Sequence, residues 1–299
     1  MGSFVSTIGG QIYLFTTLMN DPFDFKPKPL QFTAIGNPIE HSLSPEIHQL
    51  FAQQANISLE YTKTLGEAGG FNQAVQHFLA TGGKGINVTV PFKLEAYQLC
   101  DQPSERARLA GAVNTLWFEA GGIHGDVTDG IGMVRDIEHN QGVMIRGSRV
   151  LVIGAGGAVR GVLQSLLEAS PKEIVICNRT QGKAMDLAAL FEPYGTIRAV
   201  AMNALEGESF DIVINGTAAS LGNQLPSVPV SVFHGAIFAY DMMYARQPTI
   251  FMKWALDNGV EKAVDGLGML VEQAAAGFEI WHGVKVQTAP VIATLRQGV

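Results

Sequence analysis

Short apolar runs alternate with amphipathic stretches along most of the chain. In the first half, the apolar runs predict strands at 32–36, 59–65, 86–90, 112–118 and 122–127. Apolar residues recur at helical spacing after Pro45, over 71–80 and around 104–109. We expect Ser44 to cap the first of these helices, with Pro45 in its first turn. Strands that alternate with helices indicate an α/β fold, in which a mainly parallel sheet is covered on both faces.

The second half repeats this alternation around a glycine-rich turn. A strand at 150–153 leads into the turn 154–158, and a helix and a second strand at 174–177 follow. This order predicts a dinucleotide-binding βαβ unit, because the glycines let backbone N–H groups approach a pyrophosphate at a helix N-terminus. Further strands are expected at 210–214 and 237–240, and helices at 248–258 and from 266 onward.

One residue departs from the dinucleotide fingerprint. Val159 stands at the third position of the pattern, where Gly or Ala is usual. A side chain of this size is expected to push the helix slightly away from the strand.

The end of the second strand predicts which dinucleotide binds. NAD sites commonly place Asp or Glu there, but this chain has Asn178, Arg179 and Thr180, with Lys183 close behind. A guanidinium forms bidentate, charge-assisted bonds with a phosphate, and an anionic ligand would relieve the conflict between these cations and the helix dipole. The segment therefore favours NADP over a structural cluster of surface cations.

The segment 85–93 brings two polar side chains to one rim. Pro91 ends the apolar strand, so Thr89 and Lys93 are expected at the same edge of the sheet. A single lysine after a strand is more often a solvated surface charge. Gln273, beside the apolar face of the last long helix, is likewise more often a solvated residue than a ligand.

Composition limits the class of protein. The chain has 299 residues, 47% of them apolar and 16% charged, which is enough for two domains with sizeable cores. A net charge of −7 argues against nucleic acid as the main partner. The two cysteines, Cys100 and Cys177, lack metal-ligand spacing and are too few for a disulfide framework, so we expect no metal site and a reducing cytoplasm.

No apolar run is long enough for a spanning helix, so we expect no membrane partner. Residues 1–30 are expected to form an irregular leader, and they lack the basic region of a signal peptide. The first six residues fit a myristoylation pattern, but an extension of the start site is the better explanation.

Eight ordered motifs over residues 32–298 resemble the shikimate dehydrogenase family. They are 36–45, 87–93, 111–115, 125–130, 154–158, 178–180, 241–244 and 265–273. The resemblance implies two α/β domains with the active-site cleft between them. A discontinuous substrate domain would comprise 31–130 and 260–299, and a Rossmann-type NADP domain would comprise 131–259. It also implies the reversible, NADP-dependent reduction of 3-dehydroshikimate to shikimate in the biosynthesis of aromatic amino acids, by a monomer or homodimer.

The same resemblance implies roles for individual residues. Lys93 and Asp129 would form the catalytic pair. The residues that would hold the substrate are Ser42, Ser44, Thr89, Lys93, Asn114, Asp129, Tyr244 and Gln273. Those that would line the cofactor site are Glu105, Gly154, Ala155, Gly156, Gly157, Ala158, Asn178, Arg179, Thr180, Gln181, Gly182, Lys183, Met242 and Gly266. Val127 replaces an asparagine that is usual in the family, which leaves open how the loop before Asp129 is shaped.

Two alternatives remain at this stage. One is a quinate/shikimate dehydrogenase that uses NAD, which the cations after the second strand disfavour. The other is a catalytically silent relative that only binds these ligands, which the presence of both Lys93 and Asp129 disfavours.

Overall fold

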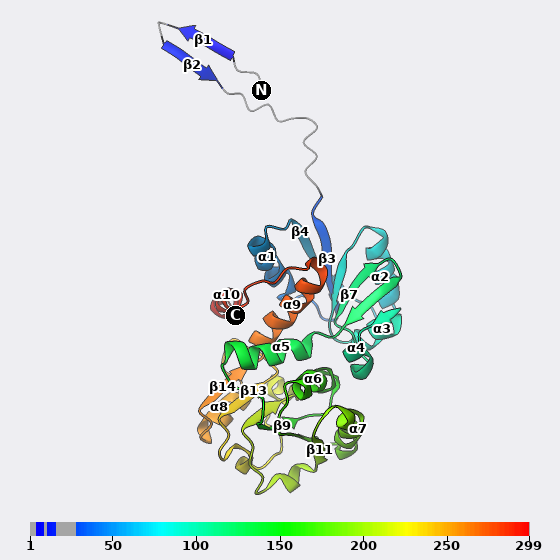
Figure 1. Ribbon diagram of the computed structural model, residues 1–299, viewed down its shortest axis with the longest axis vertical. Helices are drawn as coiled ribbons and strands as arrows, with labels where there is room; N and C mark the ends of the chain where they lie inside the picture. The colour runs from blue at the N-terminus through cyan, green and yellow to red at the C-terminus, as the bar shows by residue number, and fades with distance from the viewer. Residues whose placement is uncertain (1–3, 9–10, 16–27, 299) are drawn as a thin grey trace.

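The computed structural model describes residues 4–8, 11–15 and 28–298, which form two α/β units (Figure 1). The strands of the first unit are β3 (Leu30–Gly36), β4 (Leu59–Leu65), β5 (Gly85–Val88), β6 (Gln102–Pro103), β7 (Thr115–Glu119) and β8 (Gly122–Asp126). They lie in the order β4-β3-β5-β7-β8-β6. Only β7 runs antiparallel to its neighbours, and a short turn joins it to β8, as antiparallel strands allow.

The second unit holds an entirely parallel sheet. Its strands are β9 (Arg149–Ile153), β10 (Glu173–Cys177), β11 (Ile197–Val200), β12 (Ile212–Asn215), β13 (Phe238–Asp241) and β14 (Lys262–Asp265), in the order β11-β10-β9-β12-β13-β14. The order reverses at β9, and open parallel sheets bind ligands beside such a reversal, at the carboxyl ends of their strands. The predicted α/β class is confirmed.

Helices cover both sheets. They are α1 (Ser44–Ala55), α2 (Phe71–Ala80), α3 (Lys93–Leu99), α4 (Glu105–Ala110), α5 (Asp129–Arg135), α6 (Gly157–Glu168), α7 (Gln181–Phe191), α8 (Ile250–Asp257), α9 (Leu267–His282) and α10 (Ala289–Gly298). A π-helical turn, η1 (Asp136–Asn140), follows α5, and four short 3₁₀ turns are η2 (Glu192–Tyr194), η3 (Met202–Leu205), η4 (Ala218–Gly222) and η5 (Val230–Phe233). Among the described residues, none of the helices has both the length and the apolar character needed to cross a membrane.

Helices α5 and α9 join the two units. Figure 1 shows α5 lying across the middle of the molecule, with α9 beside it, and the two helices pack together. The apolar face predicted for α9 is buried, and Val271, Ala274 and Phe278 pack in one core cluster with Phe32 of β3 and Phe51 of α1. The chain therefore returns to its first unit near its end.

The return begins later than residue 260. Strand β14 pairs with β13 and is the edge strand of the second sheet, so Lys262–Asp265 belongs to the second unit. Its sequence, Lys-Ala-Val-Asp, has too few apolar residues to be recognised as a strand, because an edge strand needs less burial than a central one.

Two local expectations were wrong. Ser44 is the first residue of α1 rather than its cap, Leu43 precedes the helix, and no side chain caps it. The Ser44 backbone N–H instead donates to Ser42 Oγ at 3.3 Å. Within the leader, β1 (Phe4–Ile8) and β2 (Gln11–Phe15) pair antiparallel, where irregular structure was expected, because both segments are rich in β-branched or aromatic residues. The first three residues of the myristoylation pattern lie outside the described residues.

Candidate active site

A cleft of about 370 Å³ lies between the two units, and it collects the expected substrate residues. All eight line it: Ser42, Ser44, Thr89, Lys93, Asn114, Asp129, Tyr244 and Gln273. Three residues expected at the cofactor, Ala158, Met242 and Gly266, line the same cleft. Segments more than 200 residues apart in the sequence therefore meet at one site.

Lys93 and Asp129 form an ion pair in this cleft. The Lys93 Nζ lies 2.6 Å from Asp129 Oδ2, and their side chains are 29% and 14% exposed. Lys93 is the first residue of α3, where a cation opposes the helix dipole, whereas Asp129 begins α5, where an anion is favoured. The Asp129 carboxylate therefore offsets an unfavourable position of the ammonium. Lys93 is not the solvated surface charge that its local sequence suggests.

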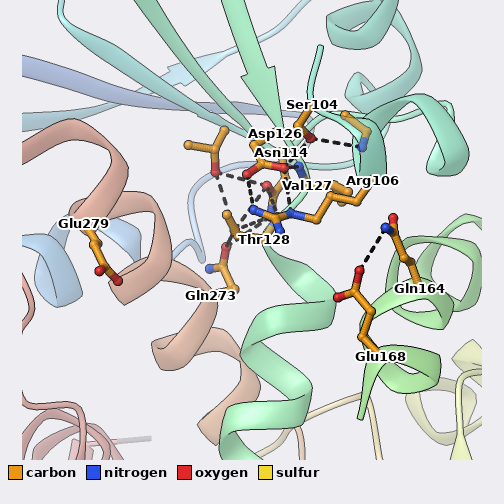
Figure 2. A network of polar contacts seen from close by, with 12 residues as sticks. Ser104, Arg106, Asn114, Asp126, Val127, Thr128, Gln164, Glu168, Gln273 and Glu279 are labelled. Atoms are coloured by element: carbon orange, nitrogen blue, oxygen red, sulfur yellow. Dashed lines mark hydrogen bonds and ion pairs between the residues drawn. The ribbon is translucent and has the colours of Figure 1, made fainter. Parts of the chain in front are cut away.

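A buried amide holds the other oxygen of Asp129. Asn114 Nδ2 lies 3.2 Å from Asp129 Oδ1 and 3.2 Å from Gln273 Oε1. Its Oδ1 accepts from the Thr128 backbone N–H at 2.9 Å. Asn114 therefore fixes the loop before Asp129 on one side and Gln273 on the other. Figure 2 shows Asn114, which directly precedes β7, converging with Thr128 of the loop and Gln273 of α9.

A second carboxylate, that of Asp126, shapes the loop before Asp129. Asp126 Oδ1 accepts from the Val127 backbone N–H at 2.8 Å, from Ser104 Oγ at 2.6 Å and from Arg106 Nε at 2.8 Å. Arg106 Nη2 reaches Asp126 Oδ2 at 2.5 Å (Figure 2). Val127 itself is buried in a small apolar cluster with Ala110 and Ala112. Asp126 therefore ties this loop to Ser104 and Arg106 without the asparagine amide that is usual at position 127.

Ser42, Ser44 and Tyr244 form one polar edge of the cleft. Ser42 Oγ lies 3.2 Å from Ser44 Oγ, and both face the cleft. Burial, and next the nearby Asp265 carboxylate, raise the pKa of the Tyr244 phenol. Tyr244 is therefore a neutral hydrogen-bond donor at physiological pH, and three hydroxyl groups are available to an acidic ligand.

Two buried carboxylates hold the loop that carries Met242 and Tyr244. Asp241 Oδ1 accepts from the Met243 N–H at 3.1 Å, and Asp265 Oδ2 accepts from the Ala245 N–H at 3.4 Å. Arg296 of α10 binds both oxygens of Asp265, at 2.8 and 2.5 Å. The terminal helix, which the sequence pattern did not reveal, therefore supports this side of the cleft.

The glycine-rich turn leaves open space in front of α6. Gly154 has a φ of +119°, which favours glycine, and its N–H donates to the Cys177 carbonyl at 2.7 Å. A Cβ placed on Gly156 or Gly157 would meet no atom within 4 Å. The first turn of α6 is thus accessible to a ligand, and its free backbone N–H groups suit an anion.

Val159 fits because a second glycine makes room for it. Its side chain is fully buried in the core of the second unit. A Cβ on Gly216, at the end of β12, would lie 2.3 Å from Val159 Cγ2. The Val159 side chain therefore occupies the space that a side chain at Gly216 would need. For this reason the valine can fit without displacing α6.

A second cavity, of about 650 Å³, lies where β10 ends. Asn178, Arg179 and Gln181 line it, together with residues 201–203. Thr180 precedes α7, and Gly182 and Lys183 are exposed in its first turn. Glu105 is exposed at the start of α4 and lines neither cavity, so the structure does not bring it together with the other residues expected at the cofactor.

The sequence reasoning missed several residues of the cleft. Asn87, His41, Met243 and Met269 also line it. A signal existed for Asn87, which is a polar residue within the buried strand β5, because an amide in such a position needs partners or a ligand.

Comparisons with known proteins agree with this arrangement. Residues 34–116 match the family described as "Shikimate dehydrogenase substrate binding domain", 137–222 match "Shikimate / quinate 5-dehydrogenase", and 266–296 match "Shikimate 5'-dehydrogenase C-terminal domain". A curated relative from Alkalilimnicola ehrlichii, "Shikimate dehydrogenase (NADP(+))", is 53% identical over 266 residues, which cover 89% of this chain and 98% of the relative.

Solved structures share the fold over nearly the whole chain. The Ael1 enzyme from Pseudomonas putida is 47% identical with a TM-score of 0.87, and the match covers 89% of this chain and 98% of that one. The shikimate 5-dehydrogenase from Thermus thermophilus, in complex with NADP(H) and shikimate, is 28% identical with a TM-score of 0.81, over 90% of this chain and 100% of that one. On this identity and coverage, the chain belongs to the shikimate dehydrogenase family.

Proposed function

We propose that this protein is an NADP-dependent shikimate dehydrogenase, which interconverts 3-dehydroshikimate and shikimate in the biosynthesis of aromatic amino acids. The observation that carries the proposal is the Lys93–Asp129 pair, 2.6 Å apart in a cleft that is also lined by Ala158 of the dinucleotide turn. The family relatives named NADP-dependent shikimate dehydrogenases support the substrate and cofactor. The monomer or homodimer and the cytoplasmic location stay predictions.

The residues around the turn fit NADP. The open space at Gly156 and Gly157 suits a pyrophosphate at the N-terminus of α6. Arg179 lines the neighbouring cavity, and the segment that follows β10 carries this arginine where NAD sites commonly have a carboxylate, which favours a phosphate on the ribose over a free hydroxyl. Glu206 also lines the cavity. Bound NADP would supply or accept the hydride, while Met242 and Gly266 would border the nicotinamide side of the cleft.

Lys93 is proposed to handle the proton of the reaction. Reduction of a ring ketone develops negative charge on the oxygen, so a donor within hydrogen-bond reach is needed. The Lys93 ammonium stabilises that oxygen and protonates it. In the direction of oxidation, neutral Lys93 removes the proton of the substrate hydroxyl.

Asp129 is proposed to orient Lys93 and to accept from a substrate hydroxyl. Asn114 holds one of its oxygens, so the other remains directed at the Lys93 Nζ. The hydroxyls of Ser42, Ser44 and Tyr244 would bind the substrate carboxylate. Thr89, Asn114 and Gln273 would contact its ring hydroxyls, since each buried polar group needs a partner.

Incubation of the purified protein with shikimate and NADP⁺ is expected to raise the absorbance of reduced nicotinamide. Parallel assays with quinate and with NAD⁺ test the rival activity. Faster oxidation of quinate with NAD⁺ would favour a quinate/shikimate dehydrogenase. Tight binding of shikimate without turnover in any pair would favour the silent ligand-binding relative, and absence of both would contradict the proposal.

Arg179→Gln is expected to raise KM for NADP⁺ by about 10- to 100-fold, because it removes charge-assisted hydrogen bonds to the ribose phosphate. The KM for NAD⁺, which lacks that phosphate, should change little. Steady-state kinetics with both cofactors measure this difference. Arg146→Gln, which changes an exposed arginine outside both cavities, is the matched control. Equal changes for both cofactors would contradict phosphate recognition by Arg179.

A further inference from the structure

The side chain of Asn87 is bound by two residues, His48 and Tyr61, to which the proposed function gives no role. It lies in β5 between the buried residues Ile86 and Val88, is 8% exposed, and lines the cleft near Thr89 and Lys93. Its amide oxygen accepts two hydrogen bonds. The Tyr61 hydroxyl, from β4, donates to Asn87 Oδ1 at 2.5 Å. His48 Nε2, from α1, lies 3.1 Å from the same oxygen.

The remaining contacts fix which way the amide points. Asn87 Nδ2 lies 3.4 Å from the Asn114 carbonyl oxygen and 3.4 Å from Thr115 Oγ1. A backbone carbonyl can only accept, so the end of the amide that faces it must be the amino group. The amide oxygen of Asn87 therefore faces His48 and Tyr61.

The protonation states of both partners make them donors. His48 is fully buried, and burial lowers its pKa to about 3, so the ring is neutral and carries a single N–H. Because Nε2 faces an acceptor, the proton is on Nε2, and Nδ1 has no partner among the described residues. Burial raises the pKa of Tyr61, so its hydroxyl also keeps its proton.

Aromatic packing holds the two donors in register. The rings of His48 and Tyr61 stack at 4.7 Å with 13° between their planes. The ring of Trp281, on α9, lies 5.1 Å from the ring of His48. The donors are therefore fixed by the core of the substrate unit before any ligand binds.

The two hydrogen bonds to Asn87 Oδ1 determine which groups of Asn87 can bind a ligand in the cleft. With both lone pairs of Oδ1 engaged, the amide can offer only N–H groups to a ligand. Both present contacts of Nδ2 are long at 3.4 Å, so an N–H remains available for a stronger acceptor in the cleft. Asn87 can thus recognise the oxygen of a hydroxyl group.

We propose that His48 and Tyr61 are positioning residues, which hold Asn87 as a hydrogen-bond donor to a hydroxyl oxygen of the substrate and thereby set the affinity for a polyhydroxylated ring. This inference rests on the proposed function, since it assumes that shikimate occupies the cleft. A purely structural role would give His48 and Tyr61 effects on folding without a selective effect on shikimate binding.

Tyr61→Phe tests the proposal with a small change, because the stacked ring stays and only the hydroxyl is lost. We expect KM for shikimate to rise about tenfold, with kcat changed less than about twofold and KM for NADP⁺ unchanged. Tyr97→Phe is the matched control, since Tyr97 lies in α3 of the same unit and its hydroxyl makes no hydrogen bond to another described residue. Wild-type KM in Tyr61→Phe would overturn the proposal.

A double-mutant cycle separates positioning from packing. In an Asn87→Ala background, Tyr61→Phe should have no further effect on the Kd for shikimate, measured by calorimetry. Additive effects in the cycle would overturn the proposal. His48→Phe, which keeps an aromatic ring in the stack, is expected to repeat the Tyr61→Phe result. If the wild-type enzyme oxidises shikimate and the cycle is additive, only this inference fails, whereas a wild type without shikimate binding or turnover contradicts the proposed function itself.

Discussion

Replacing Lys93 with methionine is expected to lower kcat for shikimate oxidation by about 10²- to 10⁴-fold, the range that a positioned acid or base contributes. The variant keeps the length of the apolar stem but loses the Nζ, which lies 2.6 Å from Asp129 Oδ2. Steady-state kinetics with NADP⁺ measure the loss. The KM for NADP⁺ should stay near its wild-type value, because Lys93 is in the first unit, whereas the glycine-rich turn and Arg179 are in the second.

The fold of the Lys93→Met variant should remain intact. The positive charge of Lys93 opposes the dipole of α3. Its loss therefore removes one unfavourable interaction together with the ion pair. Lys84→Met, at an exposed lysine of the same unit, is the control and should have wild-type activity. A kcat within about threefold of wild type in Lys93→Met would exclude Lys93 as the proton donor.

A second variant tests whether the pair acts as a unit. Adding Asp129→Asn to Lys93→Met should lower kcat little further, because residues that act together show strongly non-additive losses. Two independent losses that multiply would instead give Asp129 a role that does not depend on Lys93.

The local signals in the sequence predicted most elements of the fold. Strand β4 and helix α2 have the expected bounds, because their apolar periodicity is uninterrupted from one breaker to the next. The strand before Gly154 and the helix after it were also predicted, since a glycine turn between a buried strand and an amphipathic helix has few other structures. Strands β11 and β14 were missed because each is short and lies at an edge of the second sheet.

Long-range effects limited the prediction of the site. The motifs identified the residues of the cleft, but no local pattern says that Lys93 meets Asp129 or that Arg106 meets Asp126. The fit of Val159 depends on a glycine 57 positions later, at Gly216, so the first βα unit alone could not reveal it. Ser44 has the residue type of a helix cap, yet the preceding turn already starts the helix, and its hydroxyl is left to the cleft.

The departure at Val127 illustrates the same limit. Without the asparagine that is usual there, the sequence left open how the loop before Asp129 is shaped. The structure instead shows Asp126 binding Ser104, Arg106 and the Val127 backbone. The loop before Asp129 therefore depends on a buried carboxylate, and that carboxylate depends on one arginine for its neutralisation.

Arg106→Met is therefore expected to destabilise the protein by about 3 kcal/mol, because it leaves the charge of Asp126 buried without a partner. The Asp126 side chain is only 5% exposed, whereas that of Arg106 is 32% exposed, so water can compensate part of the loss. Urea unfolding, followed by tryptophan fluorescence, to which Trp117 in the adjacent strand β7 contributes together with Trp254 and Trp281, measures the free energy of unfolding. The kcat should fall as well, since Asp126 shapes the loop that carries Asp129.

The origin of this cost can be tested by removing the charge itself. Asp126→Asn in the Arg106→Met background should recover much of the stability, because the amide oxygen can still accept from Ser104 and from the Val127 N–H while no charge stays buried. Arg108→Met, at an exposed arginine of α4, controls for the loss of a cation from that helix. If Arg106→Met cost no more than Arg108→Met, the Asp126 carboxylate would have to be stabilised by its other two donors alone, and the loop before Asp129 would not depend on the arginine.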